Sequence, residues 1–255
     1  MRAKLTTGLM FAMLTCPAWA AAPPPASAPQ TSETKPFDPR AMESARRLAR
    51  LINQEQAQVD ATLRMVDTSF IPTLAANEDV KTMESEYPGI LKKIAEDLKP
   101  IFVTYTRRIL PEYIERYAAI YAAGFSADEI DDLYKVYASP AGQRLIASMM
   151  NNASADSLLK EAVDAPDSQS TLAAVKADHN RATAAALKQV SEEDKASFAE
   201  MMAKPYFYKM ILVGPKLRKL EQDMINEPDA SLDAEIERQL DKTIKDFIAA
   251  ADKEE

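Results

Sequence analysis

The sequence predicts an all-α fold, a compact multi-helix domain of short amphipathic helices. Apolar residues recur at intervals of three and four positions, the spacing of one helix face, in stripes over 45–66, 90–105 and 232–247. The whole chain has only 5 glycines, and no run of alternating β-branched residues indicates a strand. Pro100 predicts a kink or a break within the second stripe.

The first 20 residues are predicted to form a secretory signal peptide. Arg2 and Lys4 give a positively charged start, and 5–15 is apolar but too short to span a bilayer. An Ala-Trp-Ala pattern then ends at Ala20, so cleavage is expected between Ala20 and Ala21. We therefore expect a periplasmic or secreted protein that has no membrane span after cleavage.

Two alternatives for this segment stay open: a retained apolar anchor, and a lipoprotein signal at Cys16. Cys16 is the only cysteine, so cleavage after Ala20 leaves a mature chain without thiol or disulfide. Loss of Arg2 and Lys4 also lowers the basic count from 31 to 29 against 39 acidic residues, a net charge of −10. Phosphate backbones repel such a chain, so no nucleic-acid partner is expected.

Residues 21–40 predict a disordered, semi-extended tether, with a segment that has no role as the alternative. Proline removes an amide donor and clashes with the preceding helical turn, so this composition cannot continue a helix. Two helical regions should follow, a first over 41–165 and a second, diverged half over 166–255 that packs on it. The prolines of the tether are Pro23, Pro24, Pro25, Pro29, Pro36 and Pro39.

The stretch 125–145 has the strongest local pattern and predicts two helices joined at a sharp corner. Ser126 and Glu129 have the spacing of a capping box, in which each side chain accepts from the other residue's backbone amide. Ser139 and Pro140 should start the second helix, because proline at the first helical position loses no hydrogen bond.

Three further residues of this stretch are expected to shape the corner itself. Leu133 and Tyr137 are apolar positions that should pack inside it. Gly142 costs helix propensity, so its presence predicts a close approach of another backbone.

A fainter copy of the stretch returns at a shift of 65 positions, over 190–210, and predicts a diverged internal repeat. Each second helix should begin at or next to its proline. Chance agreement is the alternative, because caps and prolines recur in unrelated helices. The corresponding positions are Ser126 and Ser191, Glu129 and Asp194, Leu133 and Phe198, Pro140 and Pro205, Gly142 and Phe207, and Leu145 and Met210.

The first copy carries a motif of phenylalanine, a cap, acidic residues, an aromatic position and Ser-Pro-x-Gly: Phe125, Ser126, Glu129, Leu133, Tyr137, Ser139, Pro140 and Gly142. This motif resembles that of an exported bacterial family, domain of unknown function 2059 (DUF2059). The resemblance covers 41–150 well and the rest weakly, and Val136 stands where an aromatic residue is common. It implies an all-helical exported domain, and it implies no activity.

No catalytic residue, cofactor-binding residue or metal ligand is predicted, and no cofactor, so the protein is not expected to be an enzyme. His179 is the only histidine and follows Asp178, which is typical of a polar surface residue. The acidic run at 128–132 lacks the glycine and ligand spacing of a calcium loop and predicts a solvated helix face.

Tyr113, Tyr117 and Tyr121 fall at every fourth position, which predicts one helix face. Such a stripe usually packs between helices, but it is also a possible groove for an apolar ligand. Methionines near corresponding places of the two copies could extend that groove, because methionine fills gaps between helices. These are Met149, Met150, Met201 and Met202.

Three functions remain open. The leading hypothesis is a non-enzymatic protein-interaction or assembly module, whose partner is an unknown envelope protein or the chain itself. The alternative is an envelope carrier of an apolar or amphipathic small molecule in a groove lined by Tyr and Met. A hydrolase is the least favoured.

Overall fold

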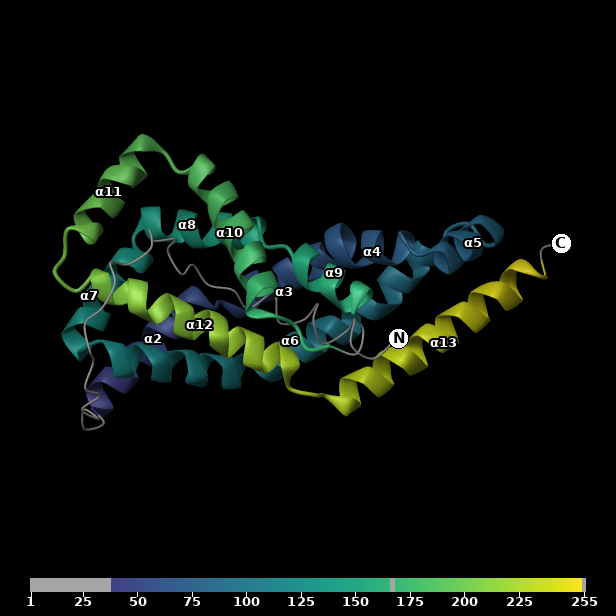
Figure 1. The fold of residues 1–255 in the computed structure, drawn as a ribbon, viewed down its shortest axis with the longest axis horizontal. Coiled ribbons are helices and arrows are strands. Elements are labelled where there is room, and N and C mark those ends of the chain that lie inside the picture. The colour runs from purple at the N-terminus through teal and green to yellow at the C-terminus, as the bar shows by residue number, and fades with distance from the viewer. Residues whose placement is uncertain (1–37, 166–167, 254–255) are drawn as a thin grey trace.

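The computed structural model describes residues 38–165 and 168–253, and within them every regular element is a helix (Figure 1). The predicted all-α fold is therefore confirmed. The predicted signal peptide and its cleavage site at Ala20 and Ala21 lie outside the described residues. None of the described helices has a stretch that is both long and apolar enough to cross a membrane.

The first described helix, α2 (Pro39–Ile52), begins within the segment predicted as a tether. The Asp38 side chain accepts from the Arg40 amide at 2.9 Å, and Pro39 occupies the first turn, where no amide donor is needed. The predicted tether boundary at 40 is therefore wrong, because a capping aspartate makes this proline a helix start rather than a breaker.

The next elements form one winding segment. Helix α3 (Glu55–Met65) continues through the π-helical turn η1 (Val66–Phe70) into the short α4 (Ile71–Ala75). Helix α5 (Glu78–Glu86) follows after a brief turn. None of the residues of α4 or α5 is fully buried, so these two helices leave part of their apolar surface uncovered.

The longest helix, α6 (Ile90–Gly124), has 35 residues and contains both Pro100 and Pro111. Of the two alternatives expected at Pro100, a kink or a break, the break is therefore wrong, and α6 is longer than the short helices that the sequence predicts. Proline removes one hydrogen bond of the helix, but packing on both sides keeps the helix continuous. Phe102 is fully buried on one side of Pro100, as is Leu98 on the other.

The first corner joins α7 (Ala127–Ala138) to α8 (Pro140–Asn151), as predicted. Ser126 Oγ accepts from the Glu129 amide at 3.3 Å, and Glu129 Oε2 accepts from the Ser126 amide at 2.8 Å, so the capping box is confirmed. The close approach at Gly142 is also confirmed, because a Cβ there would lie 2.2 Å from the Val136 carbonyl oxygen.

The second corner joins α11 (Glu192–Met202) to α12 (Tyr208–Asn226). The first helix begins after Ser191 as predicted, but α12 does not begin at Pro205. A turn over 203–207 lies between the helices, so that part of the prediction is wrong. Three helices complete the fold: α9 (Asp156–Asp164), α10 (Leu172–Gln189) and α13 (Ala230–Ala251).

One apolar core within the described residues takes members from both predicted helical regions. Leu133 and Leu145 of the first corner are buried, as are Phe198 and Met210 at the corresponding places of the second. Helices α2 and α12 pack along α6, while α13 follows the amino-terminal part of α6 and extends past it toward the C-terminus (Figure 1). The extension leaves α13 facing α4 and α5.

Candidate functional site

The tyrosine stripe is core, not a groove. Tyr113, Tyr117 and Tyr121 are each 1% exposed, and their rings stack along α6 with centroids 5.7 and 5.1 Å apart. Met149 and Met150 are buried as well. The expected packing of the stripe between helices is therefore confirmed, and the alternative of a groove at these tyrosines is wrong, because neighbouring helices cover this face of α6.

His179 is buried rather than on the surface, which corrects a second expectation. Its Nε2 lies 2.5 Å from Oε2 of Glu221, so the pair joins α10 to α12 in the interior. Burial raises the pKa of Glu221 above its ordinary value, although His179 and Arg218 oppose this shift. Removal of His179 would leave a buried carboxyl without its partner, so we expect that substitution to destabilise the fold.

The neighbouring Asp178 has a structural task. It is buried and accepts from the Ser157 and Leu158 amides at 3.0 and 3.2 Å, at the start of α9. Burial raises the pKa of Asp178, against the opposing effect of these hydrogen bonds and of Arg181. The described residues contain no cluster of three or more His, Cys, Asp or Glu that could hold a metal ion.

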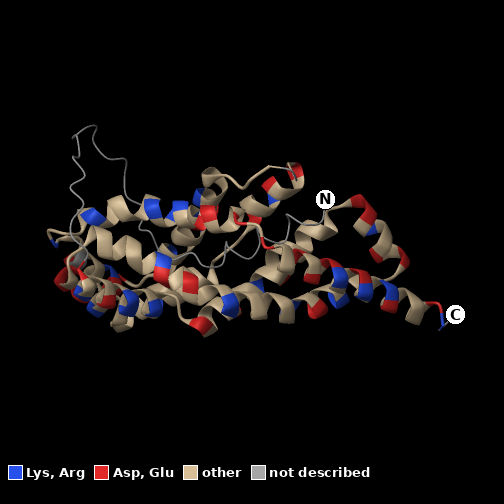
Figure 2. Cartoon of the chain, turned by 90° about the horizontal axis from the view of Figure 1, so that it is seen from below, with Lys and Arg blue, Asp and Glu red and all other residues tan. Residues whose placement is uncertain are grey.

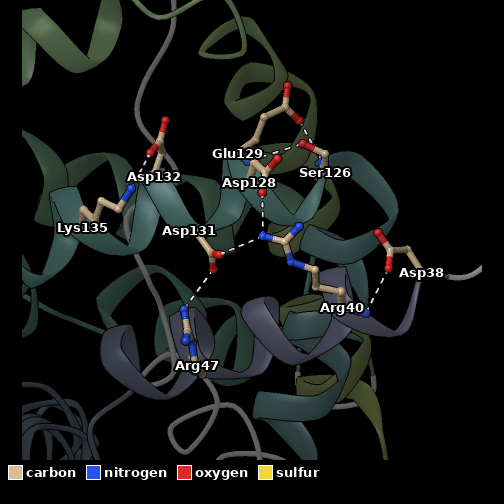
Figure 3. A network of polar contacts seen from close by, with 9 residues as sticks. All are labelled: Asp38, Arg40, Arg47, Ser126, Asp128, Glu129, Asp131, Asp132 and Lys135. Atoms are coloured by element: carbon tan, nitrogen blue, oxygen red, sulfur yellow. Dashed lines mark hydrogen bonds and ion pairs between the residues drawn. The ribbon is translucent and has the colours of Figure 1, made fainter.

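The acidic run at 128–132 joins α7 to α2 at the surface (Figure 3). Arg40 of α2 lies 2.7 Å from Asp128, and Arg47 lies 2.9 Å from Asp131, so α2 is paired along α7. The predicted solvated face is therefore also a helix contact. Such exposed pairs contribute modestly to stability, so their main effect is the register of α2 on α7.

A groove lies elsewhere, between α4 and α5 on one side and α13 on the other, with α6 as its floor and the end of α9 beside it. Its volume is about 610 Å³. Aliphatic side chains form most of its wall, and several of them are only partly buried. We call it the α5–α13 groove, and its lining residues are Thr73, Leu74, Ala76, Asn77, Glu78, Asp79, Val80, Met83, Leu91, Ile94, Ala162, Val163, Leu240 and Ile244.

Local capping places the α5 wall of this groove. Asn77 Oδ1 accepts from the Asp79 and Val80 amides at 2.9 and 3.3 Å, which starts α5. Glu84 then accepts from the amides of Gly89 and Leu91 at 2.8 and 2.9 Å, which ties the end of α5 to the start of α6. Gly89 has a φ of 94°, a left-handed backbone conformation that favours glycine at this reversal.

A polar contact fixes the α13 wall. The hydroxyl of the buried Thr243 donates to Asp97 at 2.7 Å, and Lys93 donates to the same carboxylate at 2.6 Å. Burial alone would raise the pKa of Asp97, but the hydrogen bonds from Lys93 and Thr243 outweigh it and hold the pKa below its usual value. This contact orients α13 so that Leu240 and Ile244 face the groove.

The lining of the groove combines aliphatic side chains with a few polar ones. Its polar lining residues are Thr73, Asn77, Glu78 and Asp79, all on or beside the start of α5. Acidic and basic residues are mixed along α13 on its way to the C-terminus (Figure 2). Neither His179 nor Glu221 lines the groove, so the buried pair cannot serve as its acid or base.

Sequence reasoning missed this groove because its lining comes from five helices that are distant in the chain. Only the half-apolar character of α5 pointed toward it, since Val80 and Met83 stand among charged residues. No spacing rule connects them with Leu240 and Ile244 of α13.

Comparison with known proteins gives one match. Residues 112–160 match the model of a family described as "Uncharacterized protein conserved in bacteria (DUF2059)", so the resemblance is confirmed over that segment. The segment covers the end of α6, all of α7 and α8, and the start of α9. No curated protein and no solved structure matches the chain. The residues that line the groove all lie outside the matched segment.

Proposed function

We propose that this protein is an exported, non-enzymatic binding protein that holds an amphipathic small molecule in the α5–α13 groove. The observation that carries the proposal is the open apolar wall. Leu74, Val80, Met83, Leu240 and Ile244 are partly exposed to water in it. Covering such surface is favourable by roughly 25 cal/mol for each Å² of apolar area, so an apolar ligand would stabilise the groove.

The size of the groove favours a small molecule over a folded partner. Pockets for small ligands commonly span roughly 300–1,000 Å³ and combine apolar walls with a few polar groups. The α5–α13 groove, at about 610 Å³, falls in this range, and its polar lining residues come from α4, the turn after it and the first turn of α5. That distribution suits a molecule with an apolar body and one polar head.

Export is proposed on the strength of the amino-terminal pattern. The positive start, the short apolar segment and the Ala-Trp-Ala site are features of a secretory signal. In an envelope or extracellular setting, a carrier of poorly soluble molecules has an obvious use. A non-enzymatic role is likewise proposed, because among the described residues no histidine, serine or cysteine lines the groove to activate its carboxylates or its one threonine.

A second candidate function, interaction with a protein, has an observation of its own. Leu187, Met202, Tyr208 and Leu212 are large apolar side chains exposed around α11 and its two ends. Exposed large apolar side chains that share one surface are typical of contact sites. The partner would be an envelope protein or a second copy of the chain.

The test compares two apolar substitutions on the purified mature chain. An apolar fluorescent dye such as N-phenyl-1-naphthylamine should bind, and Val80→Asp should weaken binding at least about tenfold, because a buried charge costs free energy. Leu212→Asp is the matched control at the α11 surface and should leave dye binding unchanged. Equal dye binding by wild type and Val80→Asp would refute the groove as the site.

Native mass spectrometry of protein purified from its own envelope separates the two candidates. A retained small molecule that Val80→Asp loses supports the carrier. A retained protein or a dimer that Leu212→Asp loses supports the second candidate instead. Circular dichroism of both variants checks that each remains folded.

A further inference from the structure

We propose that the α5–α13 groove selects amphiphiles with a cationic headgroup over those with an anionic one. This inference rests on the proposed function, because it names the class of ligand for the same groove. It is carried by the charges that line the groove at the start of α5 and by the hydrogen bonds that the amides there already make.

The charged lining residues of the groove have one sign. Glu78 and Asp79 line it, whereas no lysine or arginine does. Both carboxylates belong to the first turn of α5, so they lie together at the amino-terminal end of that helix. A headgroup that leaves the apolar wall at this end therefore meets negative charge.

The amides at the start of α5 do not form an anion site beside these carboxylates. Free amides at a helix start attract anions. Here Asn77 Oδ1 already accepts from the Asp79 and Val80 amides, and two carboxylates balance the positive end of the helix dipole. A carboxylate or sulfate headgroup would find these donors engaged and like charge beside them.

The two carboxylates differ in how much charge they present. Glu78 is paired with Lys81, whose Nζ lies 2.7 Å from Glu78 Oε1. Asp79 makes no ion pair with any residue in the part of the chain that the structure describes. Asp79 is therefore the main partner for a headgroup cation, and Glu78 contributes less.

The apolar part of the ligand has a matching path. From Asp79, the lining continues along α5 through Val80 and Met83 and across to Leu240 and Ile244 on α13. A single alkyl chain with a terminal ammonium suits this order of surfaces. The chemical class is thus an alkylammonium or another cationic single-chain amphiphile.

The test uses three probes with the same twelve-carbon chain, below their micellar concentrations and at low ionic strength. Dodecyltrimethylammonium is cationic, dodecyl maltoside is neutral and dodecanoate is anionic. Displacement of the apolar dye from the mature chain should rank the cation above the neutral probe and the anion last. We expect about a tenfold difference between cation and anion, and it should shrink as salt is added.

Charge variants assign the preference to the groove. Asp79→Asn should reduce the cation-to-anion ratio most, and Glu78→Gln should reduce it less. Neither should change the affinity for dodecyl maltoside. Glu237→Gln is the matched control, because it removes the same charge from the side of α13 away from the groove lining. It should leave the ratio as in wild type.

The outcomes separate this inference from the proposed function. Failure of all three probes to bind would refute the proposed function itself. Binding of dodecyl maltoside without a cation preference, or with preference for dodecanoate, would overturn only the inference. A ratio that falls equally in Glu237→Gln and Asp79→Asn would also overturn it, because the preference would then come from net charge.

Discussion

The two corners of the molecule carry proline at corresponding positions, yet one is tight and the other is open. At the first corner α8 begins at Pro140, whereas at the second a turn over 203–207 precedes α12. Gly142 allows the first to close, because a Cβ there would lie 2.2 Å from the Val136 carbonyl oxygen. Phe207 stands at the corresponding place and forbids the same approach. The proline thus predicts that the chain turns, and the glycine decides how tightly.

The corners also exchange ion pairs in a reciprocal way. Lys209 of the second corner lies 2.7 Å from Glu129 of the first, and Arg144 of the first lies 2.5 Å from Asp194 of the second. At the shift of 65, Arg144 corresponds to Lys209 and Glu129 to Asp194. Each corner therefore places a cation at one position against a carboxylate at the corresponding position of the other, as across a two-fold axis. This reciprocity supports the internal repeat, which stays a prediction.

The surroundings of the two corners differ as well. Helix α2 packs along α7, and Arg40 and Arg47 pair with its acidic face (Figure 3). None of the described helices packs along α11 in that way, and Figure 1 shows α11 at the edge of the fold. The second corner thus has buried apolar residues at the same places as the first, but no described helix covers its outer face as α2 covers α7.

Core truncation should give the largest effect and should separate the corners. Leu133→Ala is expected to lower the free energy of unfolding by about 2–5 kcal/mol, because α2, α6 and α8 surround that position. Phe198→Ala should mainly release α11, since none of the described helices packs along that helix as α2 does along α7. Urea unfolding measures the first effect, and hydrogen exchange of α11 amides measures the second.

A global loss for Phe198→Ala as large as that for Leu133→Ala would contradict this distinction. It would show that α11 unfolds together with the rest of the core. The comparison requires both variants in the same buffer, because stability in urea depends on the surface exposed on unfolding.

The sequence could predict those features of the two corners that depend on residues close together in the chain, and not those that depend on distant residues. The capping box at Ser126 and the helix start at Pro140 are local, so they were predicted to the residue. The absence of a helix start at Pro205 also has a local origin. Its cause is that Phe207 is too large to approach the backbone of the preceding helix as closely as Gly142 does. Propensity rules carry no information on that clearance.

The candidate site could not be predicted from the sequence, because it depends on contacts between helices that are distant in the chain. His179 and Glu221 are separated by 42 positions, and a lone histidine gave no sign of a buried partner. Thr243 and Asp97 are separated by 146 positions, although their contact places the α13 wall of the groove. The tyrosine stripe was correctly assigned to one helix face, but only neighbouring helices could show that the face is closed.

The glycine of the tight corner gives the next effect. Gly142→Ala should destabilise the fold by about 1–3 kcal/mol, because the added methyl group overlaps the Val136 carbonyl and Tyr137. Phe207→Ala, the same final residue at the corresponding place, should cost less, because that corner is already open. Thermal unfolding of the two alanine variants, followed by circular dichroism, measures the difference. An unchanged Gly142→Ala protein would show that the tight corner relaxes freely.

The reciprocal ion pairs predict a smaller, pH-dependent effect. Burial would raise the pKa of Glu129, but hydrogen bonds from Lys209 and from the Ser126 amide outweigh it and hold the pKa below its ordinary value. A lowered pKa stabilises the fold above the ordinary carboxyl pKa, and this contribution is lost as the pH falls through the folded-state pKa. Glu129→Gln should therefore cost about 1.5 kcal/mol at neutral pH and less in acid.

Lys209→Met should give the same pH dependence in part, because it removes one of the two lowering contacts. Urea midpoints measured from neutral pH down to pH 3 test both variants. A midpoint difference between wild type and Glu129→Gln that does not shrink in acid would show that the ion pair with Lys209 does not stabilise the fold. Arg144→Met tests the reciprocal pair in the same way, and it should weaken the protection of α11.

Loss of the caps should give the smallest effect, and it compares the corners most directly. Ser126→Ala should cost about 1 kcal/mol, because the Glu129 amide loses its acceptor. Ser191 also caps its helix, since its hydroxyl accepts from the Asp194 amide at 3.1 Å, but Asp194 turns to Arg144. Of the two caps, the first is a closed box of two bonds. Ser191→Ala should destabilise the whole fold less than Ser126→Ala and should act mainly on exchange at the start of α11. The opposite order would mean that the second corner, despite its missing cover, supports the fold as strongly as the first.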